Sequence, residues 1–497
     1  MFVLRAPNGR KHPVLIFLSI FKRSLMMNLP RKTSIIATIG TVTESPEMLE
    51  KLIKAGMNIA RINMSHAKHD QVRKIVANIR EISRRCNYAV GILMDAQGPA
   101  IRTGDLQEAL HLKPGESIAL TVKGESSDEH RSVNVNYDHL VDDLKVGDTV
   151  LIDNGEIHLK VLEKRQNQLH CEVLTEGLLG SRRHINLPGV RVSLPALTDK
   201  DLKDIELGIH LDVDFFAMSF VREASDILKL KGILDYRKTP QKIIAKLEDQ
   251  QGISNLNDII EVADAVMVAR GDLGIECPYE ELPIIQRRIV KQCIRKGKPV
   301  IVATHMLESM IENPSPTRAE ITDVSNAVFE QADAIMLSGE TSSGKYPVQC
   351  IELMDRIARR IERSGGAGFA KQAELDSEQA KLMKAACVMT DQLEAKALVI
   401  FSRSGRTARH AAWLRPEKTT IYAFTNDAKL YDQMALNWGT YPFLIQFDED
   451  EPSNTVDAAL EVLKQSGRIK IGETIVLVTE VKVKDKMVAT IQMKEVD

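Results

Sequence analysis

Short apolar runs rich in β-branched residues recur along the chain, and each is followed by a stretch with helical character. Most neighbouring runs start roughly 25 to 35 residues apart, a spacing typical of βα units in a parallel sheet. Eight such runs predict a (β/α)8 barrel, the TIM-barrel fold. The predicted strands are residues 35–39, 59–64, 91–95, 215–220, 243–248, 266–270, 300–304 and 335–338.

A long insertion separates the third predicted strand from the fourth. Between roughly Pro99 and Arg183 the pattern changes to short alternating runs, such as ESIALTV and QLHCEVL, separated by Gly, Asn and Asp. This texture predicts a small all-β domain, either a barrel or a sandwich. After about Gly365, further runs predict strands of a separate α/β domain. These runs are residues 397–402, 419–425, 442–447 and 474–480.

The N-terminus precedes the first strand signal. Val14–Phe21 is an apolar run far shorter than the ~20 residues of a membrane span. No small-x-small cleavage site follows it, and Met26 and Met27 stand just before the ordered pattern. We expect a disordered extension rather than a secretion signal. The expected domains are the extension (1–29), the barrel (30–98 and 186–365), the inserted β-barrel domain (99–185) and the C-terminal α/β domain (366–497).

Polar residues stand at the C-terminal ends of the predicted strands, where barrels of this type carry their chemistry. Glu248 and Asp272 supply two carboxylates, which suit Mg²⁺ when water and substrate phosphate complete its ligands. Lys246 and Arg61 are cations placed to hold a phosphoryl group. Strand ends are often polar because they approach solvent, but this combination predicts a phosphoryl-transfer site. Other polar residues at these ends are Asn63, Ser65, Asp95, Gln97, Arg102, Arg270, Thr304, Ser338 and Glu340.

Two local motifs resemble a phosphate-binding loop and a helix cap. Gly339–Lys345 fits GxxxxGK, the start of a phosphate-binding P-loop. Tyr346 and Pro347 follow where that motif needs Ser or Thr, and a P-loop sits in an open sheet rather than after the last strand of a barrel. We therefore assign no P-loop. Thr317–Glu320 matches a capping box and predicts the start of a helix.

Composition narrows the functional classes. The chain is 44% hydrophobic and 27% charged, which is typical of a soluble globular protein. Its net charge of −2 creates no global field that would attract nucleic acid or an anionic membrane. Six cysteines occur without a CxxC pair, which argues against a disulfide framework and suits a reducing compartment. We expect a cytoplasmic protein without nucleic-acid or membrane partners.

Long stretches resemble the pyruvate kinase family. They include AGMNIARINMSH (55–66), IIAKLEDQQG (243–252), MVARGDLGIE (267–276) and MLSGETSSGKYP (336–347), and the similarity runs from about Arg31 to the C-terminus. The family architecture is a TIM barrel with a β domain inserted after strand 3 and a C-terminal α/β domain, the layout that the spacing also predicts. The resemblance implies Mg²⁺- or Mn²⁺-dependent transfer of phosphate from phosphoenolpyruvate to ADP, giving pyruvate and ATP in glycolysis. It also implies a homotetramer.

The resemblance carries roles to residues at the barrel mouth. Arg61 would bind the phosphate, and Lys246 would stabilise the transferring phosphoryl group and the enolate. Glu248 and Asp272 would hold the divalent metal, and Thr304 would belong to the proton relay to the enolate. The implied substrate-binding residues are Arg61, Lys246, Gly271, Asp272 and Thr304.

Three further sites are implied. Potassium would be held by Asn63, Ser65, Asp95 and the carbonyl of Ala96. The residues from Ser402 to Thr407 resemble the family's sugar-phosphate effector loop, although an ordinary βα turn explains them equally well. The implied nucleotide-binding residues are Asn63, Met64, Ser65, His66, Arg102 and Arg183, and the effector-loop residues are Ser402, Ser404, Gly405, Arg406 and Thr407.

The chain departs from the family pattern near the third strand. Ala96, Gln97 and Ala100 differ from the usual Thr, Lys and Glu, which leaves the potassium requirement open. Two other functions stay open at this point. One is another metal-dependent barrel that uses phosphoenolpyruvate or pyruvate, such as a lyase. The other is a paralogue that binds ligands without efficient turnover. Further departures are Ser34, Asp249 and His305, none of which is assigned to catalysis.

Overall fold

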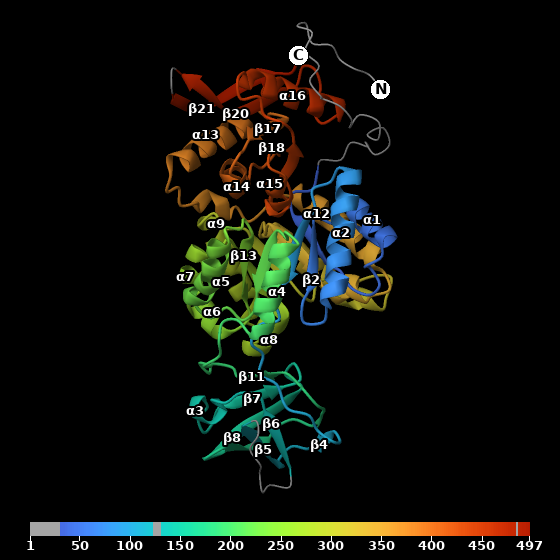
Figure 1. Cartoon of the computed structure of the whole chain (residues 1–497), viewed down its shortest axis with the longest axis vertical. Helices are drawn as coiled ribbons and strands as arrows, with labels where there is room; N and C mark the ends of the chain where they lie inside the picture. The colour runs from blue at the N-terminus through green and yellow to red at the C-terminus, as the bar shows by residue number, and fades with distance from the viewer. Residues whose placement is uncertain (1–29, 123–130, 484–485) are drawn as a thin grey trace.

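The computed structural model describes residues 30–122, 131–483 and 486–497. The expected N-terminal extension, residues 1–29, lies outside this part of the chain. Figure 1 shows three units stacked along the long axis: the C-terminal α/β unit at one end, the barrel in the middle and the β unit at the other end. Within the described ranges, no helix is long and apolar enough to cross a membrane.

Eight parallel strands close the central barrel, as predicted. Their order is β1-β16-β15-β14-β13-β12-β3-β2, so the first strand pairs with the last. Most strand residues are buried on both faces, because an inner cluster fills the barrel and the helices cover its outside. The strands are β1 (Ser34–Thr38), β2 (Ile59–Asn63), β3 (Gly91–Asp95), β12 (Phe215–Met218), β13 (Lys242–Leu247), β14 (Ala265–Ala269), β15 (Val300–Ala303) and β16 (Ala334–Leu337).

Amphipathic helices surround this barrel. The helix after β15 begins at the predicted capping box: Thr317 Oγ1 accepts from the N–H of Glu320, and Glu320 accepts from the N–H of Thr317. The helical elements of the barrel are α1 (Pro46–Ala55), α2 (His69–Cys86), α4 (Asp199–His210), α5 (Ala224–Arg237), α6 (Gln250–Ser254), α7 (Leu256–Val262), α8 (Arg270–Glu276), α9 (Leu282–Arg295), η2 (Glu308–Ile311), α10 (Arg318–Phe329), α11 (Gly339–Ser342) and α12 (Pro347–Glu362).

The insertion after β3 folds as the predicted all-β unit with its own core. Its main sheet has the order β11-β7-β8-β9-β5-β6, and β4 pairs with β10. The chain enters and leaves side by side, since Arg102 forms an antiparallel bridge with His184. The elements are β4 (Leu110–Leu112), β5 (Ser117–Val122), β6 (Ser132–Val135), α3 (Leu140–Asp143), β7 (Thr149–Ile152), β8 (Ile157–Arg165), β9 (Gln168–Val173), β10 (Gly177–Leu179) and β11 (Ile185–Asn186).

The C-terminal unit is an α/β layer with strand order β19-β18-β17-β20-β21. The edge strand β19 starts two residues earlier than predicted and includes Pro442, which an edge position tolerates. The elements are η3 (Phe369–Gln372), α13 (Glu378–Gln392), β17 (Ala397–Phe401), α14 (Arg406–Trp413), β18 (Thr420–Thr425), α15 (Ala428–Gln433), η4 (Met434–Leu436), β19 (Thr440–Leu444), α16 (Pro452–Gln465), β20 (Thr474–Val483) and β21 (Lys486–Glu495).

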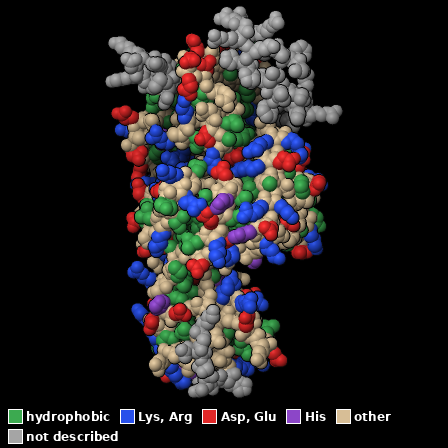
Figure 2. Space-filling model, in the orientation of Figure 1, with side chains coloured by type: hydrophobic (Ala, Val, Ile, Leu, Met, Phe, Trp, Pro, Cys, Tyr) green, Lys and Arg blue, Asp and Glu red, His purple; other side chains and the backbone are tan. Residues whose placement is uncertain are grey.

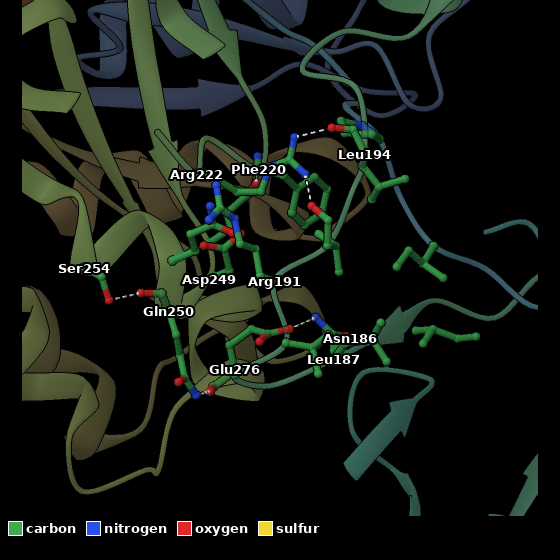
Figure 3. A pocket seen from close by; sticks show the side chains of 18 of the residues that line it. Asn186, Leu187, Arg191, Leu194, Phe220, Arg222, Asp249, Gln250, Ser254 and Glu276 are labelled. Carbon is green, nitrogen blue, oxygen red and sulfur yellow. Dashed lines mark hydrogen bonds between the residues drawn. The ribbon is translucent and has the colours of Figure 1, made fainter. Parts of the chain in front are cut away.

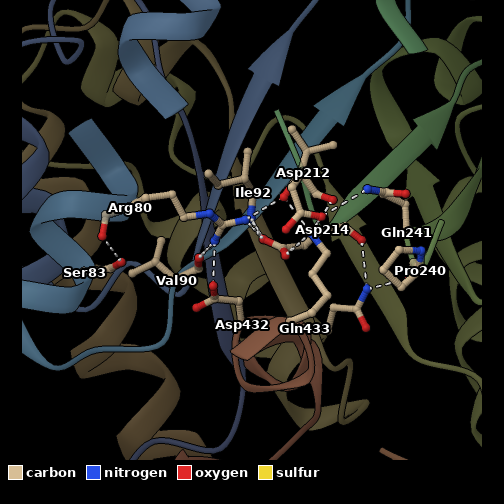
Figure 4. A network of polar contacts seen from close by, with 12 residues as sticks. Arg80, Ser83, Val90, Ile92, Asp212, Asp214, Pro240, Gln241, Asp432 and Gln433 are labelled. Atoms are coloured by element: carbon tan, nitrogen blue, oxygen red, sulfur yellow. Dashed lines mark hydrogen bonds and ion pairs between the residues drawn. The ribbon is translucent and has the colours of Figure 1, made fainter. Parts of the chain in front are cut away.

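A polar network joins the C-terminal unit to the amino end of the barrel (Figure 4). Arg80 of α2 donates to Asp432 of α15 at 2.7 Å and to Asp214 at 2.8 Å. Lys429 lies 2.8 Å from Asp212 and 2.9 Å from Asp214. Because this unit docks at the amino ends of the strands, their carboxyl ends stay free to face the inserted β unit.

Candidate active site at the carboxyl end of the barrel

Lys246 lies at the centre of the charged residues that the sequence predicts. Its Nζ is 2.8 Å from Glu248 Oε1 and 3.2 Å from Asp95 Oδ1, and it donates to Ser219 Oγ at 2.6 Å. Burial alone would lower the pKa of Lys246, but the charges of Asp95 and Glu248 outweigh burial and raise it. The ammonium group is therefore held charged in a nearly dry position.

Arg61 lies beside Lys246, and Asp95 bridges the two cations. Arg61 Nε donates to Asp95 Oδ2 at 2.7 Å, and Nη1 donates to Thr38 Oγ1 at 2.9 Å. Burial would raise the pKa of Asp95, but Lys246 and Arg61 together hold it below its ordinary value. Asp95 thus fixes both cations from one side, and Arg61 Nη2 makes no hydrogen bond with the described residues. That nitrogen is available to an anionic ligand.

Glu248 and Asp272 form the acidic side of the site. Glu248 is 1% exposed; its second oxygen accepts from the backbone N–H of Phe220 at 2.6 Å. Burial raises the pKa of Glu248 to about 7; Lys246 opposes this rise and the charge of Asp272 adds to it. Asp272 stands in the first turn of α8, directly after β14. A buried carboxylate next to a second negative charge is stabilised by any cation that binds between them.

The end of β15 brings Thr304 against the start of α8. The N–H of Gly271 donates to Thr304 Oγ1 at 2.7 Å, and this hydroxyl donates to the carbonyl of Ala303 at 2.6 Å. Thr304 and His305 both have positive φ, 67° and 53°, which is unusual for non-glycine residues. Arg270 stabilises this turn by donating to the Thr304 carbonyl at 2.6 Å. Backbone strain of this kind is common at functional sites.

The predicted potassium ligands are also neighbours. Asn63 and Asp95 are register partners on β2 and β3, and Asn63 Oδ1 accepts from the N–H of Ser65 at 3.1 Å. The Ala96 carbonyl accepts from Ser219 Oγ at 2.8 Å. All four predicted ligands offer oxygen atoms, and they lie at the ends of adjacent strands.

The predicted nucleotide residues fall into two groups. Ser65 and His66 are exposed after β2, whereas the Met64 side chain is fully buried. The Met64 N–H donates to the Asp95 carbonyl at 2.9 Å, and the Met64 carbonyl accepts from Lys200 Nζ at 2.7 Å. Arg102 and Arg183 belong to the segments that connect the barrel to the inserted unit. Arg183 forms an ion pair with Asp153 at 3.2 Å. Figure 2 shows the molecule narrowing where the inserted unit joins the barrel.

Three residues of the site are absent from the sequence prediction. Thr38 and Ser219 are hydroxyl partners of Arg61 and Lys246, and both stand near the ends of predicted strands. His184 bridges to Arg102; burial lowers its pKa, and the nearby charge of Asp272 opposes that change. A position near a strand end is the only sequence signal for the two hydroxyls, and hydroxyl side chains are common at such positions. His184 has no comparable sequence signal.

The predicted effector loop lies far from this site, in the C-terminal unit (Figure 1). Ser402 follows β17, is 3% exposed and has no hydrogen-bond partner for its Oγ. Ser404 is exposed, and Gly405 caps α14 with a φ of 77°. The loop therefore presents a buried, unpaired hydroxyl next to a helix N-terminus that begins at Arg406 and Thr407.

Comparison with known proteins covers almost the whole described chain. The model of the pyruvate kinase barrel domain matches residues 30–351, and that of the pyruvate kinase alpha/beta domain matches residues 380–492. The pyruvate kinase of Geobacillus stearothermophilus is 40% identical over 474 residues, which is 92% of this chain and 78% of that protein.

A second bacterial relative and a solved structure are also similar to this chain over most of its length. The pyruvate kinase of Staphylococcus epidermidis is 39% identical over 472 residues, covering 92% of this chain and 79% of that protein. The crystal structure of a pyruvate kinase from Cryptosporidium parvum superposes with a TM-score of 0.89 at 32% identity, covering 94% of this chain and 96% of that one. The chain belongs to the pyruvate kinase family, the phosphotransferases that move a phosphoryl group from phosphoenolpyruvate to ADP in glycolysis.

Proposed function

We propose that Lys246 and Arg61 carry the phosphoryl transfer in this chain. The observation that supports this most is the buried Lys246 ammonium, fixed at 2.8 Å from Glu248 and 3.2 Å from Asp95. Arg61 binds the phosphate of phosphoenolpyruvate through the nitrogen that Asp95 and Thr38 leave free. As the bond from phosphorus to the enol oxygen breaks, Lys246 stabilises the charge on the phosphoryl group and on the enolate.

The second half of the reaction adds a proton to the enolate carbon to give pyruvate. We assign Thr304 to this proton relay, because its hydroxyl is fixed between the Gly271 N–H and the Ala303 carbonyl. These two hydrogen bonds fix the hydroxyl between the end of β15 and the start of α8. The strained turn at Thr304 is stabilised by Arg270, which leaves the hydroxyl little freedom to rotate.

The residues present fit a divalent cation. Glu248 and Asp272 offer carboxylate oxygens, which Mg²⁺ and Mn²⁺ prefer, and the raised pKa of Glu248 marks a site that gains from added positive charge. The described residues contain no group of three or more acidic, His or Cys side chains that would enclose a metal. Water and substrate oxygens would complete the ligands. The bound cation would neutralise charge on the phosphoryl oxygens.

The site would also bind a potassium ion and ADP. Asn63, Ser65, Asp95 and the Ala96 carbonyl would hold potassium. ADP would lie against the exposed Ser65 and His66, with Met64 beneath them. Arg102 and Arg183 would reach the nucleotide from the inserted unit. Because Asp95 already compensates Arg61 and Lys246, we expect potassium to raise activity without being indispensable.

Metal titration tests the acidic pair. We expect Glu248→Gln and Asp272→Asn each to raise the Mg²⁺ concentration for half-maximal activity at least about tenfold, because a charged oxygen ligand is lost. Glu352→Gln, on the exposed face of α12, is the control and should leave the titration unchanged. An unchanged titration for both site variants would place the metal elsewhere.

We also propose an effector site in the C-terminal unit and a tetrameric assembly. The loop Ser402–Thr407 would bind a phosphorylated effector through the unpaired Ser402 hydroxyl and the N-terminus of α14. The chain would act as a homotetramer. Sedimentation velocity measures the second point directly, and a monomer at micromolar concentration would contradict it.

A further inference from the structure

A cavity of about 440 Å³ lies where the connection from the inserted unit meets the barrel (Figure 3). Its two walls differ. The wall formed by the inserted unit and the connection after β11 is mainly apolar, whereas the wall formed by the residues after β13 and the end of α8 is polar. The apolar wall includes Ile101, Ile185, Leu187, Val190, Val192 and Leu194.

This cavity adjoins the proposed reaction site and shares Glu248 and His184 with it. Of the residues assigned to phosphoryl transfer and metal binding, only Glu248 lines it. Arg61, Lys246, Asp272 and Thr304 do not, and neither does any residue proposed for the nucleotide. From Glu248 the cavity extends along α6 and the end of α8, whose residues line it.

Two buried acceptors without hydrogen-bond partners belong to residues that line the cavity, Asn186 of β11 and Gln251 of α6. Asn186 is 4% exposed; its Nδ2 donates to Glu276 Oε1 at 2.9 Å, but its Oδ1 has no hydrogen-bond partner. Gln251 Oε1 is also buried without a partner. A buried unpaired acceptor costs free energy that a donor from a ligand would recover.

The charges around the cavity favour a ligand that is positively charged as well as a hydrogen-bond donor. Glu276 is 8% exposed and forms no ion pair with the described residues, and burial raises its pKa to about 7. The cavity is lined by two arginines and four acidic residues, so acidic side chains outnumber basic ones. Arg222 is already engaged, because it donates to the carbonyls of Val192 and Leu194 at 3.1 and 2.7 Å. Arg191 is exposed at the rim.

We propose that this cavity binds a small organic cation: an amidinium or guanidinium group attached to an apolar body. Its planar N–H groups would donate to Glu276 and to Asn186 Oδ1 together, since Asn186 already contacts that carboxylate. The apolar body would pack against the apolar residues that line the cavity. The volume is within the range of small-molecule sites, about 300–1,000 Å³. An inorganic ion would leave the apolar wall unused.

Calorimetry on the full chain, with benzamidine as the probe, tests this proposal. We expect saturable binding at one site, no binding of benzoate, and no displacement by phosphoenolpyruvate or by ADP with Mg²⁺. Glu276→Gln should weaken benzamidine at least about tenfold, because a charge-assisted hydrogen bond is lost. Glu280→Gln is the matched control; Glu280 is exposed and does not line the cavity, so affinity should not change.

A second variant covers the case in which Glu276→Gln fails to fold. Val190→Phe fills the cavity from its apolar wall and should abolish benzamidine binding while the melting curve stays cooperative. Wild-type affinity in either folded variant, equal binding of benzoate, or displacement of benzamidine by the substrates would overturn the proposal. Absence of benzamidine binding to the wild-type chain would also overturn it.

Discussion

At Lys246, burial and charge act in opposite directions. Removing an ammonium group from water costs several kcal/mol, roughly, and only close anionic partners make it tolerable. Asp95 and Glu248 supply those partners from β3 and from the end of β13. The Lys246 ammonium is therefore fixed in place and stays charged, so it can attract an anionic ligand. Such preorganised charge is the largest contribution to many enzymatic rate accelerations.

Lys246→Met tests this residue directly. We expect a folded protein whose kcat falls by at least about 10²–10³, the scale for losing one preorganised charge stabiliser. The melting temperature should also change, because Asp95 and Glu248 lose a partner, so kcat and melting curves are measured together. Lys242→Met, at the half-buried start of the same strand, is the control. Near-normal turnover in folded Lys246→Met would refute the role.

The charged site residues and several neutral ones, such as Thr304 and Asn63, were predictable from sequence, whereas Thr38 and Ser219 were missed. Lys246, Glu248 and Arg61 stand out because ions are costly to bury at strand ends without a purpose. Thr38 and Ser219 carry no such signal, since hydroxyls are common near strand ends for many reasons. Their importance depends on the barrel register, which places each hydroxyl beside a particular cation. The roles of all these residues stay predictions until they are measured.

Among the elements, α10 stabilises the segment that follows Thr304. Glu320 closes the capping box and also accepts from the N–H of Ser309 at 2.7 Å and from its hydroxyl at 2.6 Å. One carboxylate therefore connects the start of α10 to the 3₁₀ turn η2. The pKa of Glu320 is below its ordinary value: these hydrogen bonds outweigh the effect of burial, which would raise it.

Thr317→Ala removes the cap of α10. We expect a loss of about 1 kcal/mol in stability, the typical value for an N-cap, with kcat changed less than about twofold. Thr317→Ser retains the oxygen and serves as the control, which should melt close to the wild type. Chemical denaturation with a coupled activity assay measures both quantities. Equal stability of the Ala and Ser variants would show that the cap contributes nothing.

Strand positions were predictable to within a few residues because each buried strand is a continuous apolar run. The largest differences are in the C-terminal sheet: β21 was not among the predicted strands, and β19 begins two residues and ends three residues before the apolar run 442–447. Pairing with β18, rather than hydrophobicity, fixes its bounds at Thr440–Leu444. The hydrophobic pattern of one strand does not show where its neighbouring strand begins and ends. The bounds of edge strands are therefore the hardest to predict from sequence.

Over the whole molecule, the interval between the third and fourth strands predicted an insertion, and the structure confirms one. The contacts between units were not predictable. The network of Arg80, Asp214 and Asp432 joins three segments that lie far apart in sequence (Figure 4). Only the folded arrangement brings them together. The exact domain boundaries remain predictions.

Asp432 gives this junction a pH dependence. Burial raises its pKa to about 7; Arg80 opposes this rise and Asp214 adds to it. The folded state therefore retains a proton that the unfolded chain, with a pKa near ~4, releases. This group's contribution to stability is complete below about pH 4 and is lost as the pH rises through about 7.

Asp432→Asn stays uncharged at every pH. Its melting temperature relative to the wild type should rise by about 2–4 °C between pH 5 and pH 8, the shift that ~1 kcal/mol causes in a large domain. Asp258→Asn, on the surface of α7, controls for the general effect of losing a carboxylate. A difference between Asp432→Asn and wild type that stays constant with pH would contradict this assignment.

The most direct test of the central claim is the stoichiometry of the reaction catalysed by the purified chain. Phosphoenolpyruvate, ADP and Mg²⁺ are supplied, and pyruvate and ATP are quantified in the same sample. We expect equal amounts of the two products, no pyruvate without ADP, and loss of both products in folded Lys246→Met. Pyruvate formed without ADP, or no product from the folded wild-type chain, would contradict it.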